Sequence, residues 1–254
     1  MGEPELKVVE YGKENSDVIM LLHGGGLSWW NYRDEANLLK ENYHVVLPVL
    51  DGHTESDASF TSIEDNAQEL IRYIDERFHG SILAMGGLSL GGQVLVEALS
   101  QRGAICAYAV IESALVVPLP LTEALIAPTF GASYGLIKKK WFSEMQFKSL
   151  GIQAKLFDDY YRDTCEIQKK DMIRFLKSSS SYVIKPGLSG AAAKTTILVG
   201  GKERKAMLRS AEILHDTIPD SRLQVLQQYG HGEFSLNHPK GYVDLLTRMV
   251  SPLR

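Results

Sequence analysis

The sequence of 254 residues lacks the features of several common classes of protein. It contains two cysteines, Cys106 and Cys165, too few for a disulfide framework or a thiolate metal cage. Lysine and arginine together number 27, against 31 aspartate and glutamate residues, which leaves a net charge of −4. A dedicated nucleic-acid binder needs a basic surface to neutralise phosphates, so we expect no nucleic-acid partner.

Long uninterrupted apolar runs are also missing. The longest apolar stretch, residues 104–125, is broken by Glu112, Pro118 and Pro120, so it predicts no membrane span. Residues 1–7 lack the basic start and apolar stretch of a secretory signal. With so few cysteines, the chain fits a reducing compartment, and we expect a cytoplasmic protein.

Apolar residues make up 44% of the chain, enough to bury a sizeable core. Short apolar runs alternate with helical patterns, which predicts a mostly parallel central sheet flanked by helices, an α/β fold. The predicted strands are 18–22, 43–50, 81–85, 107–111, 195–199 and 222–226. The predicted helices are 31–40, 61–78, 93–102, 206–216 and 242–249.

Residues 114–190 do not follow this alternation. They include two early prolines, a long helical pattern at 158–177 and a serine run at 178–181 that is typical of a helix-ending loop. We interpret this segment as a helical cap inserted into a core formed by 1–113 and 191–254. The segment carries 11 basic and 7 acidic residues, whereas the other 177 residues carry 16 and 24, so a basic insertion joins an acidic core.

One short motif combines a strand end with a candidate nucleophile. Gly87-Leu88-Ser89-Leu90-Gly91 follows an apolar run and precedes a helical pattern. This context is typical of a nucleophile elbow, in which a serine occupies a strained turn between small neighbours. The same stretch has the glycine spacing of a phosphate-binding loop, but Gln93 stands where that chemistry needs lysine. A glycine-rich turn with an incidental serine remains the structural alternative.

A serine needs a base, and the base needs an acid to orient it. His231 follows the predicted strand 222–226, and Glu203 follows the predicted strand 195–199. Both positions lie at the carboxyl edge of the sheet, where the active sites of open α/β folds form. The chain order Ser89, Glu203, His231 is the order expected for such a triad. Glu112, at the end of another predicted strand, is the alternative acid.

Glycines after the first predicted strand offer backbone donors for an oxyanion. His23-Gly24-Gly25-Gly26 follows residues 18–22 and reaches the same sheet edge. We predict an oxyanion hole formed by the N–H groups of Gly25 and Leu90. Gly26, Trp29 and Trp30 are candidate substrate-binding residues, although packing is the simpler role for both tryptophans.

These motifs together resemble the α/β-hydrolase superfamily. The resemblance covers the chain outside the insertion, and includes a loop, Asp51-Gly52-His53 with Ser56, in which Thr54 replaces a glycine common in the family. It implies a serine hydrolase with a helical cap, acting on a small-molecule acyl substrate without a metal or organic cofactor.

The resemblance leaves the reaction open. A carboxylesterase is the simplest expectation. A thioesterase, a lipase-type enzyme, a carbon–carbon bond hydrolase and a non-catalytic small-ligand receptor are the alternatives, because one fold hosts many functions. The sequence does not indicate an oligomeric state.

Overall fold

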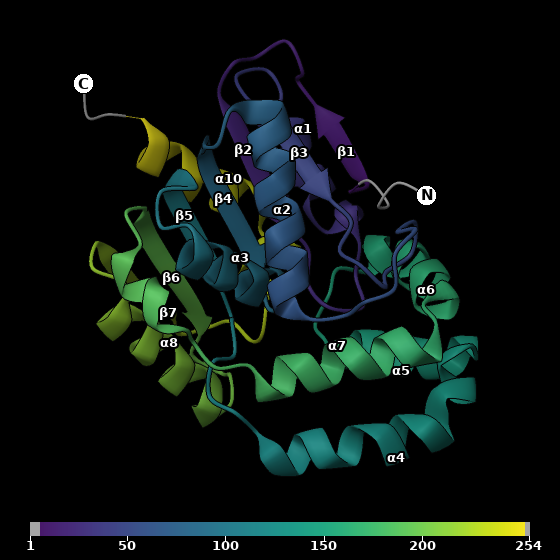
Figure 1. Ribbon diagram of the computed structural model, residues 1–254. Helices are drawn as coiled ribbons and strands as arrows, with labels where there is room; N and C mark the ends of the chain where they lie inside the picture. The colour runs from purple at the N-terminus through teal and green to yellow at the C-terminus, as the bar shows by residue number, and fades with distance from the viewer. Residues whose placement is uncertain (1–5, 252–254) are drawn as a thin grey trace.

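The computed structural model describes residues 6–251, which form a central sheet with helices on both faces (Figure 1). The sheet has seven strands in the order β1-β3-β2-β4-β5-β6-β7. Only the edge strand β1 runs antiparallel to its neighbour β3. The predicted fold class, a mostly parallel sheet flanked by helices, is therefore confirmed. Residues 1–5 lie outside the described residues. They belong to the segment 1–7, which we expect not to be a secretory signal.

The strands are β1 Val8–Tyr11, β2 Val18–Leu22, β3 His44–Pro48, β4 Ile82–Leu88, β5 Cys106–Glu112, β6 Lys194–Gly200 and β7 Ser221–Leu226. The α-helices are α1 Arg33–Leu39, α2 Ile63–Phe78, α3 Leu90–Gln101, α4 Pro120–Ile137, α5 Lys140–Ser149, α6 Phe157–Glu166, α7 Lys169–Ser181, α8 Lys205–Thr217, α9 Glu233–Asn237 and α10 Pro239–Val250. Three short 3₁₀ helices are η1 Trp29–Tyr32, η2 Ala154–Leu156 and η3 Pro186–Gly190.

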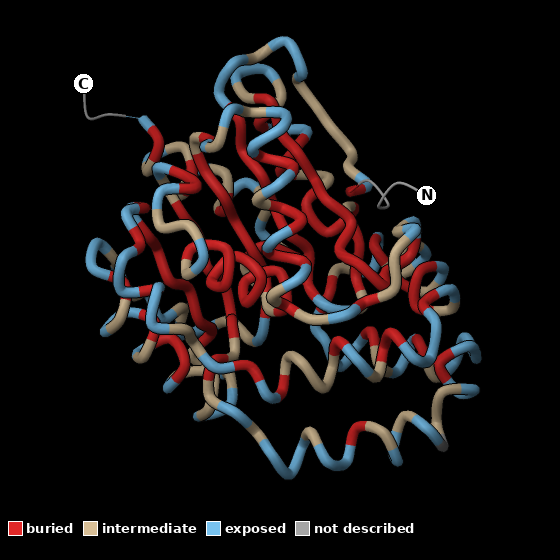
Figure 2. The backbone as a smooth tube through the Cα atoms, in the orientation of Figure 1, coloured by how far each residue is buried: buried red, intermediate tan, exposed pale blue. Residues whose placement is uncertain are grey.

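The inner strands are apolar on both faces because helices cover both. All five residues of β2 are buried, and successive side chains enter opposite clusters. Met20 and Leu22 pack in the cluster with α2, α3 and α8, whereas Ile19 and Leu21 pack in the cluster with α1 and α10. Figure 2 shows these buried strands at the centre of the molecule.

Helix α2 illustrates how local sequence sets the ends of an element. The Ser62 hydroxyl accepts the Asp65 N–H at 3.0 Å and so caps the start of the helix. The helix ends at His79, whose left-handed φ of 58° turns the chain toward β4.

Between β5 and β6 the chain forms helices α4 to α7, which lie beyond the carboxyl ends of the strands (Figure 1). Phe175 of α7 stacks on His53 in the loop after β3. Thr54 of the same loop donates to the Asp163 carbonyl of α6 at 3.0 Å. By contrast, η3, within the predicted insertion, packs against α3 of the core.

Two local predictions in this segment were wrong. The helical pattern at 158–177 is not one helix, because Ile167 and Gln168 adopt extended ψ angles of 127° and 141° between α6 and α7. The serine run 178–181 is not a helix-ending loop, because α7 continues to Ser181. The Ser181 hydroxyl donates back to the Lys177 carbonyl at 2.9 Å, which lets serine remain in a last helical turn.

Candidate active site

Ser89 occupies a strained turn between β4 and α3. Its φ of 52° and ψ of −110° are unfavourable for a residue with a side chain. The Ser89 N–H donates to the Glu112 carbonyl at 2.8 Å, which ties the turn to the end of β5. Ser89 itself is only partly buried, so the turn presents its hydroxyl toward solvent. This is the geometry that the Gly-x-Ser-x-Gly motif predicts.

The flanking glycines are required by close backbone approach. A Cβ at Gly87 would lie 2.4 Å from the Gly91 carbonyl oxygen, and a Cβ at Gly91 would lie 2.3 Å from that of Leu22. Neither contact is possible for a real side chain. The two glycines therefore allow α3 to begin directly against β4 and β2.

The structure brings Ser89, His231 and Glu203 together. Ser89 Oγ lies 3.0 Å from His231 Nε2, and His231 Nδ1 lies 2.7 Å from Glu203 Oε2. The three residues follow β4, β7 and β6, whose carboxyl ends share one edge of the sheet. The His231 side chain is 46% exposed, whereas that of Glu203 is 1% exposed. Solvent can therefore reach the serine–histidine pair but not the carboxylate behind it.

Glu203 is held by donors on both of its oxygens. Oε1 accepts the Ser113 hydroxyl at 2.7 Å and the Gly200 N–H at 2.8 Å, and Oε2 faces His231. Burial raises the pKa of Glu203, but the hydrogen bond and charge of His231, with the donors Ser113 and Gly200, outweigh it and lower the pKa below 4.5. An ionised carboxylate favours the His231 tautomer that carries its proton on Nδ1.

Glu112, the alternative acid, is buried behind this arrangement. Its Oε1 accepts the Ser235 N–H at 3.3 Å, and no hydrogen-bond partner reaches Oε2 within the described part of the chain. Burial raises the pKa of Glu112 to about 7. The hydrogen bond to His231 is made by Glu203 and not by Glu112.

The glycine loop after β2 lies beside the start of α3. A Cβ built on Gly25 would be in ordinary contact, at 3.5 Å, with the Cβ of Leu90. Leu90 is the first residue of α3, so its N–H has no acceptor within the helix. The two predicted oxyanion donors are thus neighbours, next to Ser89.

Two buried histidines fix this loop. His53 Nε2 accepts the Gly26 N–H at 3.0 Å, and His53 Nδ1 donates to the Asp51 carbonyl at 3.0 Å. His23 Nδ1 donates to the Gly24 carbonyl at 2.9 Å, and His23 Nε2 accepts the Leu50 N–H at 3.1 Å. Because the Gly26 N–H donates to His53, it is not free to donate to a substrate in this arrangement.

The two tryptophans that follow the loop differ in access. Trp29 is partly exposed, and its Nε1 donates to Glu55 Oε1 at 3.4 Å. Trp30 is 1% exposed and donates to Asp163 Oδ2 at 2.6 Å. Trp30 therefore joins the loop to α6 from the interior, which leaves Trp29 as the tryptophan with surface to offer a substrate.

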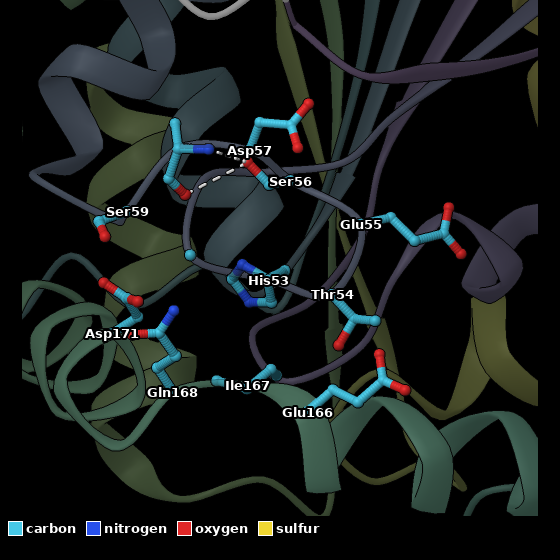
Figure 3. Close-up of a pocket in the computed structure, with 12 residues that line it drawn as sticks. His53, Thr54, Glu55, Ser56, Asp57, Ser59, Glu166, Ile167, Gln168 and Asp171 are labelled. Carbon is cyan, nitrogen blue, oxygen red and sulfur yellow. Dashed lines mark hydrogen bonds between the residues drawn. The ribbon is translucent and has the colours of Figure 1, made fainter.

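A separate small pocket of about 190 Å³ lies between loop 52–59 and residues 166–171 (Figure 3). Its lining is polar and includes four acidic residues, Glu55, Asp57, Glu166 and Asp171. Neither Ser89 nor His231 lines it, so this pocket is distinct from the serine–histidine pair.

Ser113 and His53 are the residues of the site whose contributions sequence reasoning missed. Ser113 lies two residues after the predicted strand 107–111, which is the only sequence signal for it. Residues 6–251 contain no cluster of three or more histidine, cysteine or acidic side chains suited to a metal ion. None of the helices in the same range combines the length and apolar character needed to cross a membrane.

Comparison with known proteins agrees with the fold. The model of the alpha/beta hydrolase family matches residues 19–245. The chain belongs to this family of hydrolases, which confirms the resemblance seen in the sequence. A curated relative, the uncharacterized hydrolase YugF of Bacillus subtilis (strain 168), is 23% identical over 235 residues, covering 87% of this chain and 85% of YugF.

Solved structures with the same fold include two esterases. An esterase from Exiguobacterium antarcticum superposes with a TM-score of 0.80 at 17% identity, covering 96% of this chain and 95% of its own. A thermophilic esterase from Thermogutta terrifontis gives 0.78 at 17% identity, covering 97% and 94%. At such low identity, these similarities establish the fold.

Proposed function

We propose that the protein is a serine hydrolase that cleaves a carboxylic ester through an acyl-enzyme. The observation that carries this proposal is the 3.0 Å contact between Ser89 Oγ and His231 Nε2, with Glu203 at 2.7 Å from the other ring nitrogen. Membership of the hydrolase family and the two esterases of the same fold support it.

In the first half of the reaction, Ser89 Oγ attacks the ester carbonyl while its proton passes to His231 Nε2. The N–H groups of Gly25 and Leu90 donate to the resulting oxyanion. The ionised Glu203 stabilises the imidazolium. His231 then gives the proton to the departing alcohol oxygen, and the carbon–oxygen bond of the ester breaks.

In the second half, water attacks the acyl group on Ser89. His231 Nε2 accepts a proton from this water and returns it to Ser89 Oγ as the acid leaves. The exposed position of His231 supports this step, because solvent reaches the imidazole directly.

Helices α4 to α7 act as the cap, and Trp29 contributes to the substrate-binding surface. We propose that the protein works in the cytoplasm.

Labelling with a fluorophosphonate probe tests the nucleophile. We expect stoichiometric modification of Ser89, and we expect Ser89→Ala to lose both labelling and hydrolysis of activated esters. Ser59→Ala is the matched control, since Ser59 lies in the loop of the separate pocket. Ester hydrolysis by Ser89→Ala at the parental rate contradicts the mechanism. If the probe does not label Ser89 and a small ligand raises the Tm, the result favours the alternative function, a non-catalytic small-ligand receptor.

A substrate panel tests the bond that is cleaved. Esters of increasing acyl length are compared with thioester and diketone substrates. We expect the largest kcat/KM for a carboxylic ester with a small or medium acyl chain. A clear preference for a thioester or a diketone overturns the ester assignment and leaves the serine chemistry intact.

A further inference from the structure

The outer surface of the insertion carries most of the exposed large apolar side chains. Nine such side chains are exposed in the described part of the chain, and six of them fall between residues 121 and 150. The six are Leu121, Leu125, Leu136, Trp141, Met145 and Leu150. Single exposed leucines are normal, but a concentration of this kind marks an interaction site.

Helix α4 is apolar on the face that it turns to solvent. Its inner face, with Ile126 and Ile137 buried, packs toward α7. Leu121 and Leu125, one turn apart, are 75% and 53% exposed. Residues 124–137 contain no charged side chain. A solvent-facing helix is normally polar on its outer face, so α4 departs from the usual pattern. Figure 2 shows α4 as the outermost helix below α7, largely exposed.

Helix α5 continues this apolar face. Phe147 is buried, whereas Trp141 and Met145, again one turn apart, are 61% and 54% exposed. Helices α4 and α5 contact each other, so the exposed apolar residues lie on two adjoining helices, with Leu121 and Leu125 near the end of α4 that is farther from α5. We call the exposed apolar residues of 121–150 the α4–α5 face.

Lysines border the α4–α5 face. Lys138, Lys139 and Lys140 join the two helices, and Lys148 lies in the last turn of α5. All four are exposed, and none forms an ion pair with another residue in the range 6–251. Lys138 and Lys140 lie over the rings of Tyr134 and Phe157, at 5.6 and 5.9 Å from the ring centroids. All four lysines stay exposed, so an anionic partner can reach them.

We propose that the α4–α5 face docks the protein on an anionic lipid bilayer. The apolar side chains enter the boundary between headgroups and acyl chains, and the lysines contact the headgroups. Trp141 has the amphipathic ring that favours this boundary. The membrane is bound peripherally, since no described helix can cross it.

Charge favours a lipid surface over a second copy of the chain. Residues 121–150 carry four lysines and two glutamates, so a symmetric dimer through this face would bring together two surfaces of net positive charge. An anionic bilayer is complementary to them. Docking depends on exposed side chains of α4 and α5 and not on the Ser89 chemistry, so it stands independently of the proposed reaction.

Co-sedimentation of the full chain with vesicles tests the proposal. We expect binding to vesicles of phosphatidylcholine with phosphatidylserine, weaker binding to phosphatidylcholine alone, and loss of binding at high salt. Replacing Lys138, Lys139 and Lys140 together by glutamine is expected to weaken binding roughly a hundredfold. The double change Leu121→Ser and Leu125→Ser removes apolar contact area and is expected to weaken binding at every salt concentration.

Matched controls separate this surface from general charge and hydrophobicity. Lys194, Lys205 and Lys240 are exposed lysines outside the insertion, and their combined replacement by glutamine is expected to preserve most of the binding. Leu38→Ser, on α1, is the apolar control. We expect the tryptophan fluorescence to shift to the blue when the protein binds vesicles. The change Trp141→Phe is expected to abolish this shift. The insertion variants change only exposed side chains and are expected to keep the far-UV circular dichroism of the parent.

Three results overturn the proposal. The first is no binding to either vesicle by the parent. The second is equal binding by the insertion variants and the controls. The third is self-association of the parent without vesicle binding, abolished by the leucine changes, which would assign the α4–α5 face to a dimer.

Discussion

The Ser113 hydroxyl donates a 2.7 Å hydrogen bond to Oε1 of Glu203, a residue 90 positions further along the chain. Ser113 directly follows β5, with a left-handed φ of 54°. The same oxygen accepts the Gly200 N–H, so Oε2 is left to face His231. Donors from the ends of three strands therefore fix the position of one carboxylate, and Ser113 is a positioning residue for the proposed reaction.

Replacing Ser113 by alanine is expected to lower kcat for a soluble ester by about tenfold to a hundredfold. A hydrogen bond to a charged group contributes roughly 1.5–3 kcal/mol, and this one holds Glu203 against His231. KM should change little, since Ser113 is buried and lies behind the triad. Because this bond also helps to lower the pKa of Glu203, the acid limb of the kcat profile should move to higher pH.

Ser100→Ala is the control for this change. The Ser100 hydroxyl donates to the Val96 carbonyl within α3, away from the triad. We expect parental kcat and an unshifted profile from it. A Ser113→Ala enzyme that changes only in KM, or not at all, contradicts the positioning role.

Glu112 and Glu203 are expected to respond differently when each is replaced by glutamine. Glu203→Gln removes the negative charge that faces His231 Nδ1–H and should lower kcat by about 10² to 10⁴. Glu112→Gln should retain most of the activity, because Glu112 makes no hydrogen bond to His231. Steady-state kinetics on both variants tests this. Greater loss from Glu112→Gln would make Glu112 the acid of the triad.

The buried Glu112 also predicts a pH dependence of stability. Burial raises its pKa from 4.5 to about 7 in the folded protein. Between these values the unfolded chain releases a proton that the folded protein keeps, so the free energy of unfolding falls as pH rises. Above about pH 7 both states are ionised, and the penalty stays constant.

Glu112→Gln should therefore gain stability relative to the parent as pH rises from about 4.5 to about 7, by up to about 3 kcal/mol. Urea unfolding at several pH values measures the difference. Glu76→Gln, an exposed change on α2, is the control and should follow the parent. A stability difference independent of pH would show that Glu112 keeps an ordinary pKa.

The parts of this molecule that could be predicted from the sequence are those governed by local pattern. The apolar runs of β2 to β6 are buried on both faces, so consecutive apolar residues in the sequence predict these strands. Glycines mark the turn at Ser89 because backbone atoms there leave no room for a Cβ. His231 and Glu203 were found from their places after strands.

Other parts depend on contacts between distant segments. The edge strand β1 has four half-buried residues and no apolar run, so its pairing with β3 is visible only in three dimensions. The break at Ile167 interrupts a helical pattern without proline or glycine. The bonds from Ser113 to Glu203 and from Gly26 to His53 join loops that follow different strands. Spacing along the chain does not encode them.

Acid is expected to destabilise the protein through His53. Burial lowers the pKa of His53 from 6.5 to about 4. Between about pH 6.5 and about pH 4, His53 binds a proton in the unfolded chain but stays neutral in the folded protein. The free energy of unfolding therefore falls as the pH falls through this range. This one histidine contributes up to about 3 kcal/mol to the loss.

His53→Gln should flatten this dependence, since glutamine does not titrate and its side-chain oxygen can accept the Gly26 N–H. Urea unfolding between about pH 4 and about pH 6.5 measures the slope. His215→Gln, at an exposed position on α8, is the matched control. Equal slopes for His53→Gln and the parent would mean that His53 does not contribute.

Gly91 sets the distance between α3 and β2, so Gly91→Ala is expected to lower the free energy of unfolding by about 1–3 kcal/mol. The new Cβ would lie 2.3 Å from the Leu22 carbonyl oxygen, a backbone atom that cannot rotate away. Relief requires α3 to move from the strand that leads to Gly25, so hydrolysis of a soluble ester should fall too. Gly190→Ala is the control, because a Cβ there meets nothing within 4 Å. Urea unfolding and ester kinetics compare the two, and equal behaviour would mean that the turn at Ser89 tolerates a Cβ at Gly91.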